Sequence, residues 1–332
     1  PEALARAGQE LAEEVTRAAG KQYVFFKAWG KIRRAARDRG ITLLGDMPLF
    51  VAPDSADVWA HREYFQLDGD GYPTEVAGVP PDYFSAQGQV WGNPLYRWDA
   101  MAQDGWRWWQ ERFRVLGEEA DWRIDHFRGF EALWAVPAGA RDARQGRWKP
   151  GPGAALFHAV EQAVPDLGFV AEDLGLITRP VTELREGLGF PGMRILQFHT
   201  RTRQDGLTDF ATEPGCLAYT GTHDNNTLLG WLQEDLDEET FARIWQMVMP
   251  GEAGAPDRSR AREMTEPLLR YLYSRNARWA MVPGQDLLGL SSGSRMNIPG
   301  TPEGNWQWKL KKGQLTRELA ERLRKMVREW GR

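Results

Sequence analysis

The chain has 332 residues, of which 42% are hydrophobic, and this length is enough for one large α/β domain with a sizeable core. A formal net charge of −4 gives no electrostatic reason to expect nucleic acid or an acidic membrane as a partner. No segment has the apolar length of a signal or membrane helix, and the single cysteine, Cys216, cannot form an intramolecular disulfide, so we expect a cytoplasmic protein.

Helical and strand-like segments alternate along most of the chain. Residues 3–39 carry apolar side chains at helical spacing, among them Leu11, Val15 and Ala18, and end at Gly40. Short apolar runs predict strands at 41–44, 122–124, 167–171, 193–198, 216–220 and 286–290. Helical patterns separate most of them, at 104–116, 153–163, 180–188, 238–248 and 257–277. This alternation predicts a parallel sheet, either doubly wound or closed into a (β/α)8 barrel.

Acidic residues at the ends of the predicted strands favour the barrel. Asp46, Asp125, Glu172 and Asp224 each follow a different apolar run, and barrel enzymes place catalytic residues at the C-terminal ends of their strands. A doubly wound nucleotide fold would need a glycine fingerprint after its first strand, which is absent. We therefore expect an α/β fold, a (β/α)8 TIM barrel. Residues 51–121 are too long for a simple crossover and predict an inserted subdomain.

Three of these acids fit the requirements of glycoside chemistry. Cleavage of a glycosidic bond needs one carboxylate at the anomeric carbon and one protonated carboxyl at the leaving oxygen. Asp125, Glu172 and Asp224 are the candidates, the third acid serving to hold the distorted sugar ring. Any one of them alone is more often a helix cap or a solvated loop residue. All three at strand ends are much harder to explain in that way.

Neighbouring residues suggest how the acids divide the work. Arg123 lies two residues before Asp125, on the same face of a strand, where its charge would keep Asp125 ionised; the plainer explanation is an ordinary salt bridge. The apolar run before Glu172 would raise its pKa toward that of a general acid. His126 and His223 could bind sugar hydroxyls, although a lone histidine is more often structural. Several of the sixteen tryptophans lie in turn-like sequence, where their rings could stack on sugars.

Longer motifs carry a resemblance to a known clan. The segments 45–48, 123–129, 171–175 and 221–225 resemble the four signature regions of the α-amylase clan. Together with 77–85, 88–94, 295–297 and 305–306, they more narrowly resemble the amylomaltase or disproportionating-enzyme family, the 4-α-glucanotransferases of glycoside hydrolase family 77. The resemblance covers essentially the whole chain.

The resemblance implies roles for individual residues. Asp125 would be the nucleophile, Glu172 the acid/base and Asp224 the stabiliser of the transition state. The residues implied in substrate binding are Asp46, Asp82, Tyr83, Phe84, Gln89, Trp91, Arg123, His126, His223 and Asn297. The implied reaction transfers a segment of an α-1,4-glucan to the 4-hydroxyl of an acceptor by retaining double displacement. Maltooligosaccharides and other α-1,4-glucans would be its substrates, in starch, glycogen or maltodextrin metabolism, with no cofactor and no metal.

Two alternatives remain open at this stage. An α-amylase-type hydrolase would use the same acids, but the histidine that amylases carry at the end of their first signature region is absent after Asp46, which favours a transferase. An inactive glucan-binding fragment would keep the aromatic cleft, but it would have no need of three acids at strand ends. A metal enzyme is a weaker idea, because the five histidines include no pair with ligand spacing.

The resemblance also predicts what the N-terminal part contains. The strand before Asp46 would be the third of the barrel, so that the subdomain at about 51–121 lies between barrel strands 3 and 4. Residues 1–39 supply only helices, and we expect the first two strands to be missing, which makes the chain N-terminally truncated. The activity of this chain alone is then in doubt, because barrel layers draw side chains from alternate strands.

Overall fold

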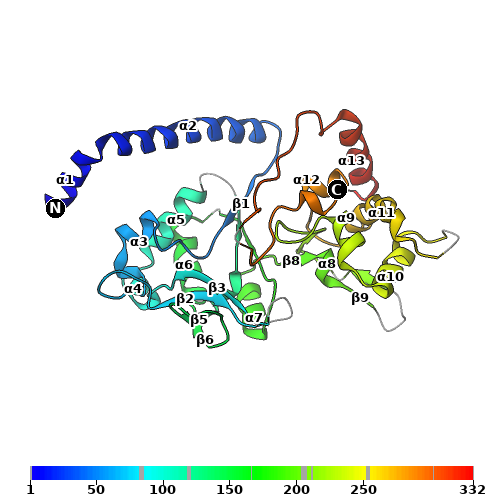
Figure 1. Ribbon diagram of the computed structural model, residues 1–332. Coiled ribbons are helices and arrows are strands. Elements are labelled where there is room, and N and C mark those ends of the chain that lie inside the picture. The colour runs from blue at the N-terminus through cyan, green and yellow to red at the C-terminus, as the bar shows by residue number, and fades with distance from the viewer. Residues whose placement is uncertain are drawn as a thin grey trace.

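Six parallel strands form the frame of the protein in the computed structural model (Figure 1). The first sheet has the order β1 (Leu44–Met47), β4 (Asp121–Ile124), β7 (Phe169–Ala171). The second has the order β8 (Met193–Ile195), β11 (Leu217–Tyr219), β12 (Trp279–Met281). The structure describes residues 2–81, 86–117, 121–165, 167–202, 208–210, 212–251, 255–301 and 303–331.

The two sheets share one interior. The backbone N–H of Ala171 in β7 donates to the carbonyl of Pro191, just before β8, at 2.9 Å. One apolar cluster joins buried residues of β7, β8 and β11, and Leu44 of β1 and Met281 of β12 pack against it. Strands of both sheets, including the outer strands β1 and β12, thus contribute to one shared apolar cluster. The expected mixed α/β fold is therefore observed.

Amphipathic helices cover these strands where the sequence predicts them. They are α5 (Arg107–Gly117), α6 (Ala154–Ala163), α7 (Arg179–Gly187), α10 (Glu238–Val248) and α11 (Ala261–Tyr273). In α6, Leu156, Phe157 and Val160 share one buried face. The Asp237 carboxylate caps α10 by accepting from the Thr240 N–H at 2.7 Å, which satisfies a donor of the first turn.

An antiparallel sheet lies beside the parallel strands and has the order β3-β2-β5-β6. Its members are β2 (Glu75–Val79), β3 (Gln89–Pro94), β5 (Ala132–Pro137) and β6 (Arg147–Pro150). The last two strands come after β4, so the sheet begins inside the expected insertion at 51–121 and is completed beyond it. Pairing between such distant segments leaves little trace in local sequence.

Three predicted strands differ from the observed ones. The run predicted at 193–198 is a strand only as far as Ile195, and the helix α8 (Leu196–His199) follows it. No strand forms at 286–290: Pro283 precedes the short helix α12 (Gly284–Leu287), and the last strand is β12. The first strand begins at Leu44 rather than at Ile41, which is 54% exposed, because pairing with β4 fixes the register from Leu44 to Met47. Apolar character alone thus predicted the existence of β1 but not its bounds.

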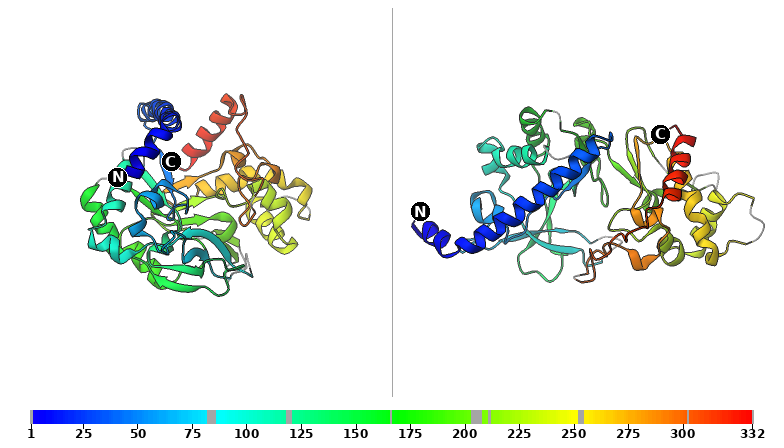
Figure 2. Two further views of the ribbon diagram at one scale, coloured as in Figure 1. Left: turned by 60° about the vertical axis from the view of Figure 1, so that its left-hand side comes forward. Right: turned by 90° about the horizontal axis from the view of Figure 1, so that it is seen from above.

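The N-terminal segment forms two helices, α1 (Glu2–Glu10) and α2 (Ala12–Arg37), which meet at Leu11. Ala36 is their only buried residue within the part of the chain that the structure describes. Figures 1 and 2 show α2 extending past the remaining elements, with the N-terminus at its far end. Among the described residues, no helix has the length and apolar character needed to cross a bilayer.

The remaining elements are short connections and a C-terminal helix. They are α3 (Ala56–Ala60), η1 (Arg62–Tyr64), α4 (Trp98–Gln103), η2 (Phe127–Phe130), α8 (Leu196–His199), β9 (Thr200–Thr202), β10 (Thr208–Phe210), α9 (Leu228–Gly230), η3 (Trp231–Asp235), η4 (Arg258–Arg260), η5 (Ser292–Ser294) and α13 (Arg317–Glu329). The helix α13 packs on α11 through buried Met326.

An aromatic cluster fills the core beside β4. Trp109 of α5 is fully buried, and its ring lies 5.5 Å from that of Phe130 and 5.8 Å from that of Phe113. We expect Trp109→Ala to lower the free energy of unfolding by about 3–5 kcal/mol, because it removes a large buried ring and leaves a cavity. Urea denaturation followed by circular dichroism measures this loss. Trp59→Ala, where the indole is 70% exposed, should change stability by less than about 0.5 kcal/mol, and equal losses for both would contradict the packing described.

Candidate active site

The predicted acids meet at one end of the parallel strands. Asp46 lies in β1, Asp125 and Glu172 directly follow β4 and β7, and Asp224 lies in the loop after β11. Their charges act on one another: Asp46 and Asp224 raise the pKa of Asp125, and Asp125 raises the pKa of Glu172. The structure therefore brings the sequence-predicted carboxylates into a single site.

Arg123 joins two of the acids. Its side chain is only 10% exposed and projects from β4, where Nη1 donates to Asp46 Oδ1 at 2.5 Å and Nη2 donates to Asp125 Oδ1 at 2.9 Å. Desolvation raises the pKa of Asp125, and the guanidinium charge acts against that rise. The sequence predicted the sign of the Arg123 effect, but the net shift is upward because desolvation is the larger cause.

Glu172 occupies a drier position than Asp125. The residue is 9% exposed, and burial raises its pKa to about 7, as the apolar run before it predicts. Its two carboxyl oxygens accept from backbone N–H groups: Oε2 from His126 at 2.8 Å and Oε1 from Leu174 at 2.9 Å. The backbone of His126 is left-handed, with φ 50° and ψ 48°. A carboxyl with this pKa can both give and take a proton near neutrality.

Asp173 anchors the turn that carries Glu172, and the sequence analysis did not identify it. Its side chain is 4% exposed and accepts from the Met193 N–H at 2.7 Å. Arg194 and Arg185 place cationic nitrogens at 3.2 and 3.3 Å from Asp173 Oδ2. These contacts tie the end of β7 to the start of β8. The feature of the sequence that could have identified Asp173 is its position as a second acid directly after Glu172.

The loop after β11 holds Asp224 from several sides. Asn297 donates its Nδ2 to Asp224 Oδ1 at 2.6 Å, and His223 Nε2 lies 3.4 Å from Asp224 Oδ2. The Arg295 guanidinium donates to the Asp224 carbonyl at 2.6 Å. His223 and Asn297, which the resemblance implies in substrate binding, both contact Asp224, whereas Arg295 was quoted only as part of a motif.

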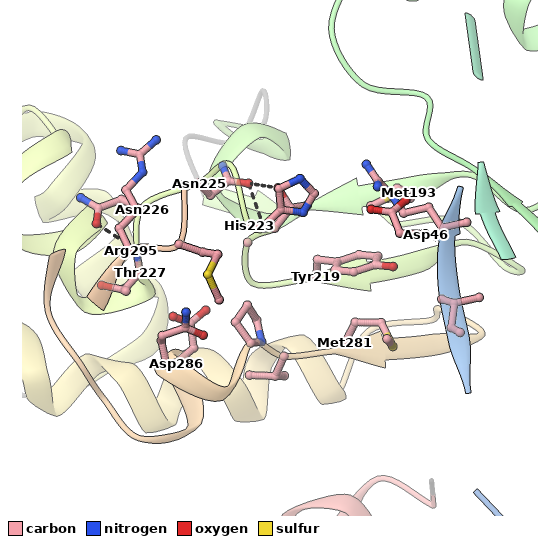
Figure 3. Close-up of a pocket in the computed structure, with 18 of the residues that line it drawn as sticks. Asp46, Met193, Tyr219, His223, Asn225, Asn226, Thr227, Met281, Asp286 and Arg295 are labelled. Atoms are coloured by element: carbon pink, nitrogen blue, oxygen red, sulfur yellow. Dashed lines mark hydrogen bonds and ion pairs between the residues drawn. The ribbon is translucent and has the colours of Figure 1, made fainter. Parts of the chain in front are cut away.

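A buried polar layer supports the same loop (Figure 3). Asp286 is 3% exposed and accepts from Thr220 Oγ1 at 2.6 Å and from the Leu228 N–H at 2.7 Å. Burial raises the pKa of Asp286 to about 6. Asn225 Oδ1 accepts from both the N–H and the hydroxyl of Thr222 at 2.9 Å. The sequence analysis missed Asp286 because it assigned the residue to a strand.

A cavity of about 350 Å³ opens beside Arg123 and the loop after β11, with Asp46, Tyr219 and His223 in its wall (Figure 3). Strand residues from both outer edges line it, including Leu44 and Met281. Of the four predicted acids, only Asp46 is among the residues that line this cavity, together with Arg123, the partner of Asp125. Within the described chain, no group of three or more His, Cys, Asp or Glu side chains is arranged to hold a metal ion.

Aromatic rings mark the other flank of the site. The Trp91 ring lies 4.9 Å from that of His126 in an edge-to-face arrangement, and Gln89 Oε1 accepts from Trp91 Nε1 at 3.1 Å. Burial lowers the pKa of His126 to about 4, so its imidazole is neutral at neutral pH. Of the remaining expected substrate residues, Asp82, Tyr83 and Phe84 lie outside the described part of the chain.

Comparisons with known proteins point to one family. The family model described as 4-alpha-glucanotransferase matches residues 1–316. A 4-alpha-glucanotransferase of Thermus thermophilus is 44% identical over 98% of this chain and 65% of its own length. One of Streptococcus pneumoniae serotype 4 is 43% identical over 95% of this chain and 61% of its own length. The chain thus spans less than two thirds of the length of these relatives.

Solved structures agree with the sequence comparison. Amylomaltase from Streptococcus agalactiae in complex with acarbose has a TM-score of 0.91 and 37% identity, covering 100% of this chain and 66% of that one. Amylomaltase from Corynebacterium glutamicum has a TM-score of 0.80 at 21% identity over 92% of this chain and 49% of that one, a likeness of fold.

The shifted pKa of Glu172 predicts a pH-dependent stability. Because the folded-state value of about 7 lies above the ordinary 4.5, folding favours the protonated form. That stability is complete below pH 4.5 and is lost as the pH rises through 7, a loss of at most about 3 kcal/mol. We expect Glu172→Gln to lack this loss, as measured by urea unfolding from pH 4.5 to 8. Exposed Glu161→Gln controls for the removal of a carboxyl, and identical pH profiles for wild type and Glu172→Gln would refute the assignment.

Proposed function

We propose, because the chain belongs to the 4-alpha-glucanotransferase family, that it carries the catalytic acids that move a segment of an α-1,4-glucan to the 4-hydroxyl of an acceptor sugar. The observation that carries this proposal is the contrast between two neighbouring carboxyls. Asp125 is paired with the Arg123 guanidinium, whereas Glu172 is buried against backbone N–H groups with a pKa of about 7. A retaining glycosidase-type mechanism needs one carboxyl of each kind.

In the first step, the protonated Glu172 gives its proton to the glycosidic oxygen as that bond breaks. The Asp125 carboxylate attacks the anomeric carbon from the opposite face, and a covalent glycosyl-enzyme forms while the shortened glucan leaves. The charge of Arg123, which lies on the same strand face, favours the ionised form of Asp125 that this attack requires.

In the second step, Glu172 has become a carboxylate and accepts the proton of the incoming 4-hydroxyl. The acceptor oxygen attacks the anomeric carbon, the bond to Asp125 breaks, and a second inversion restores the α configuration. Asp224, held by Asn297 and His223, is placed to bind hydroxyls of the distorted donor ring. Over the two steps, Glu172 gives up one proton and regains one, and Asp125 passes the glycosyl group from the donor to the acceptor. These steps use no cofactor.

The substrates proposed are maltooligosaccharides and other α-1,4-glucans. Acarbose bound to the Streptococcus agalactiae relative and the names of the curated relatives support this class. Trp91 and Gln89 would flank the acceptor, and Asp46 and His126 would line the donor position. The single cysteine, Cys216, is buried and free, in keeping with the reducing cytoplasm that we propose as the location.

We also propose that the six parallel strands belong to a (β/α)8 barrel. Leu44 of β1 and Met281 of β12 pack against one interior cluster, although these strands lie at opposite ends of the observed order. Two further strands between β1 and β12 would close the ring, with the inserted subdomain after barrel strand 3.

The covalent step predicts a trapped intermediate. With a slow fluorinated maltosyl fluoride, wild type should accumulate a glycosyl adduct on the peptide that contains Asp125, as measured by mass spectrometry. Asp125→Asn should form none, because an amide oxygen is a poor nucleophile. The exposed turn variant Asp70→Asn serves as the control and should label like wild type. An adduct on Asp125→Asn at the wild-type rate would show that another residue attacks the sugar.

The acceptor of the second step is tested by the product pattern from maltotriose. The protein expressed from its complete reading frame should yield glucose together with a ladder of longer maltooligosaccharides, as resolved by chromatography. A hydrolase would yield only shorter sugars, and a binding protein would leave maltotriose unchanged. Either of these patterns would overturn the transferase proposal.

A further inference from the structure

Trp306 adopts a backbone conformation that a bulky residue rarely takes. Its φ is 60°, in the left-handed region, and its side chain is 60% exposed. Such strain persists only where the surrounding structure imposes it, and it is found preferentially at ligand-binding sites. An exposed indole gains nothing from the core that would explain this conformation.

The loop that carries Trp306 is braced by its own hydrogen bonds. The Trp306 N–H donates to the Met296 carbonyl at 2.7 Å, and the Ile298 N–H donates to Asn305 Oδ1 at 2.9 Å. Asn305 Nδ2 in turn donates to the Thr301 carbonyl at 2.9 Å. These bonds fix the two stems of the loop against each other, so the indole is presented in a defined position.

Trp306 stands between the acid site and a second hollow. One side of its ring faces His223, with centroids 5.1 Å apart, and the residue lines the cavity that Asp46 and His223 also border. It also lines an open hollow of about 620 Å³, whose other walls are Asn297, Thr301, Glu303, Gly304, Asn305 and Gln307. Amide, hydroxyl and carboxylate groups therefore surround one exposed aromatic ring.

We propose that Trp306 and this hollow form a binding position for a glucosyl unit of an α-glucan, on the Asp224 side of the bond that is cleaved. The inference rests on the proposed function and extends it to a residue with no assigned role. A glucose ring offers an apolar C–H face that stacks on an indole and a rim of hydroxyls that amides and carboxylates bind. Trp91 flanks the acids beside His126, and Trp306 flanks them beside His223. A glucan lying along the acids would reach both rings.

The position predicts a dependence on chain length. A short sugar occupies only the places next to the acids, whereas a longer one extends to Trp306. In an Asp125→Asn background, which prevents turnover, we expect the further change Trp306→Gly to raise the Kd for maltoheptaose about 3–10-fold. The Kd for maltotriose should change less than about twofold. Isothermal titration calorimetry measures both without any need for catalysis.

Matched variants distinguish the effect of the indole ring on affinity from the effect of the loop's backbone conformation. Glycine adopts φ 60° without strain, so Trp306→Gly removes the ring while keeping the loop conformation, whereas Trp306→Phe keeps an aromatic face and should retain most of the affinity. Trp59→Ala, which removes an exposed indole of α3, should leave both Kd values unchanged. Thermal melts establish that each variant is folded.

The outcomes distinguish this inference from the function on which it rests. If the Asp125→Asn parent binds both sugars and Trp306→Gly changes neither Kd, the proposed function stands and the Trp306 position is refuted. An equal loss for both sugars also refutes it, because Trp306 would then act only through His223. If the Asp125→Asn protein binds neither sugar, both the proposed function and the Trp306 binding position are refuted.

Discussion

One buried cation sets the arrangement on which the site depends. Arg123 contacts Asp46 on the neighbouring strand and Asp125 just beyond the end of its own, and in the register of β1 and β4 Arg123 lies directly opposite Asp46. Two carboxylates this near each other would repel without a positive charge between them, and a buried guanidinium without acidic partners would be costly. The pairing of β1 with β4 and the attraction between Arg123 and the two carboxylates therefore favour the same arrangement of these three side chains.

The site separates its two working acids by their surroundings rather than by distance along the chain. Glu172 is buried and accepts from two backbone N–H groups, and desolvation outweighs the opposing charge of Arg123, so its pKa rises to about 7. Asp125 is exposed on one side and paired with Arg123, which opposes the same desolvation. Carboxyl groups in similar positions after two adjacent strands thus acquire opposite tasks.

The sequence predicted those parts of the site that follow from local pattern. An apolar run that ends in an acid is a short-range signal, and Asp125, Glu172 and Asp224 were all found in this way. The antiparallel sheet was not predicted as such, because β2 pairs with β5 across a long stretch of chain. Asp286 was assigned to a strand because its neighbours are apolar, whereas its bonds to Thr220 and Leu228 follow from tertiary packing. The left-handed backbone of His126 was likewise not predicted, because the residue type only permits it.

The hydrogen bonds to Glu172 have an evolutionary consequence. Both donors are peptide N–H groups, of His126 and Leu174, so they do not depend on which side chain occupies either position. Genetic drift at these positions can alter the walls of the site while the contacts that orient the acid are inherited unchanged. The exceptions are proline, which has no N–H, and β-branched residues at position 126, which resist a positive φ. Substitutions at positions 126 and 174 can therefore change the substrate preference of the site while Glu172 keeps its orientation as proton donor.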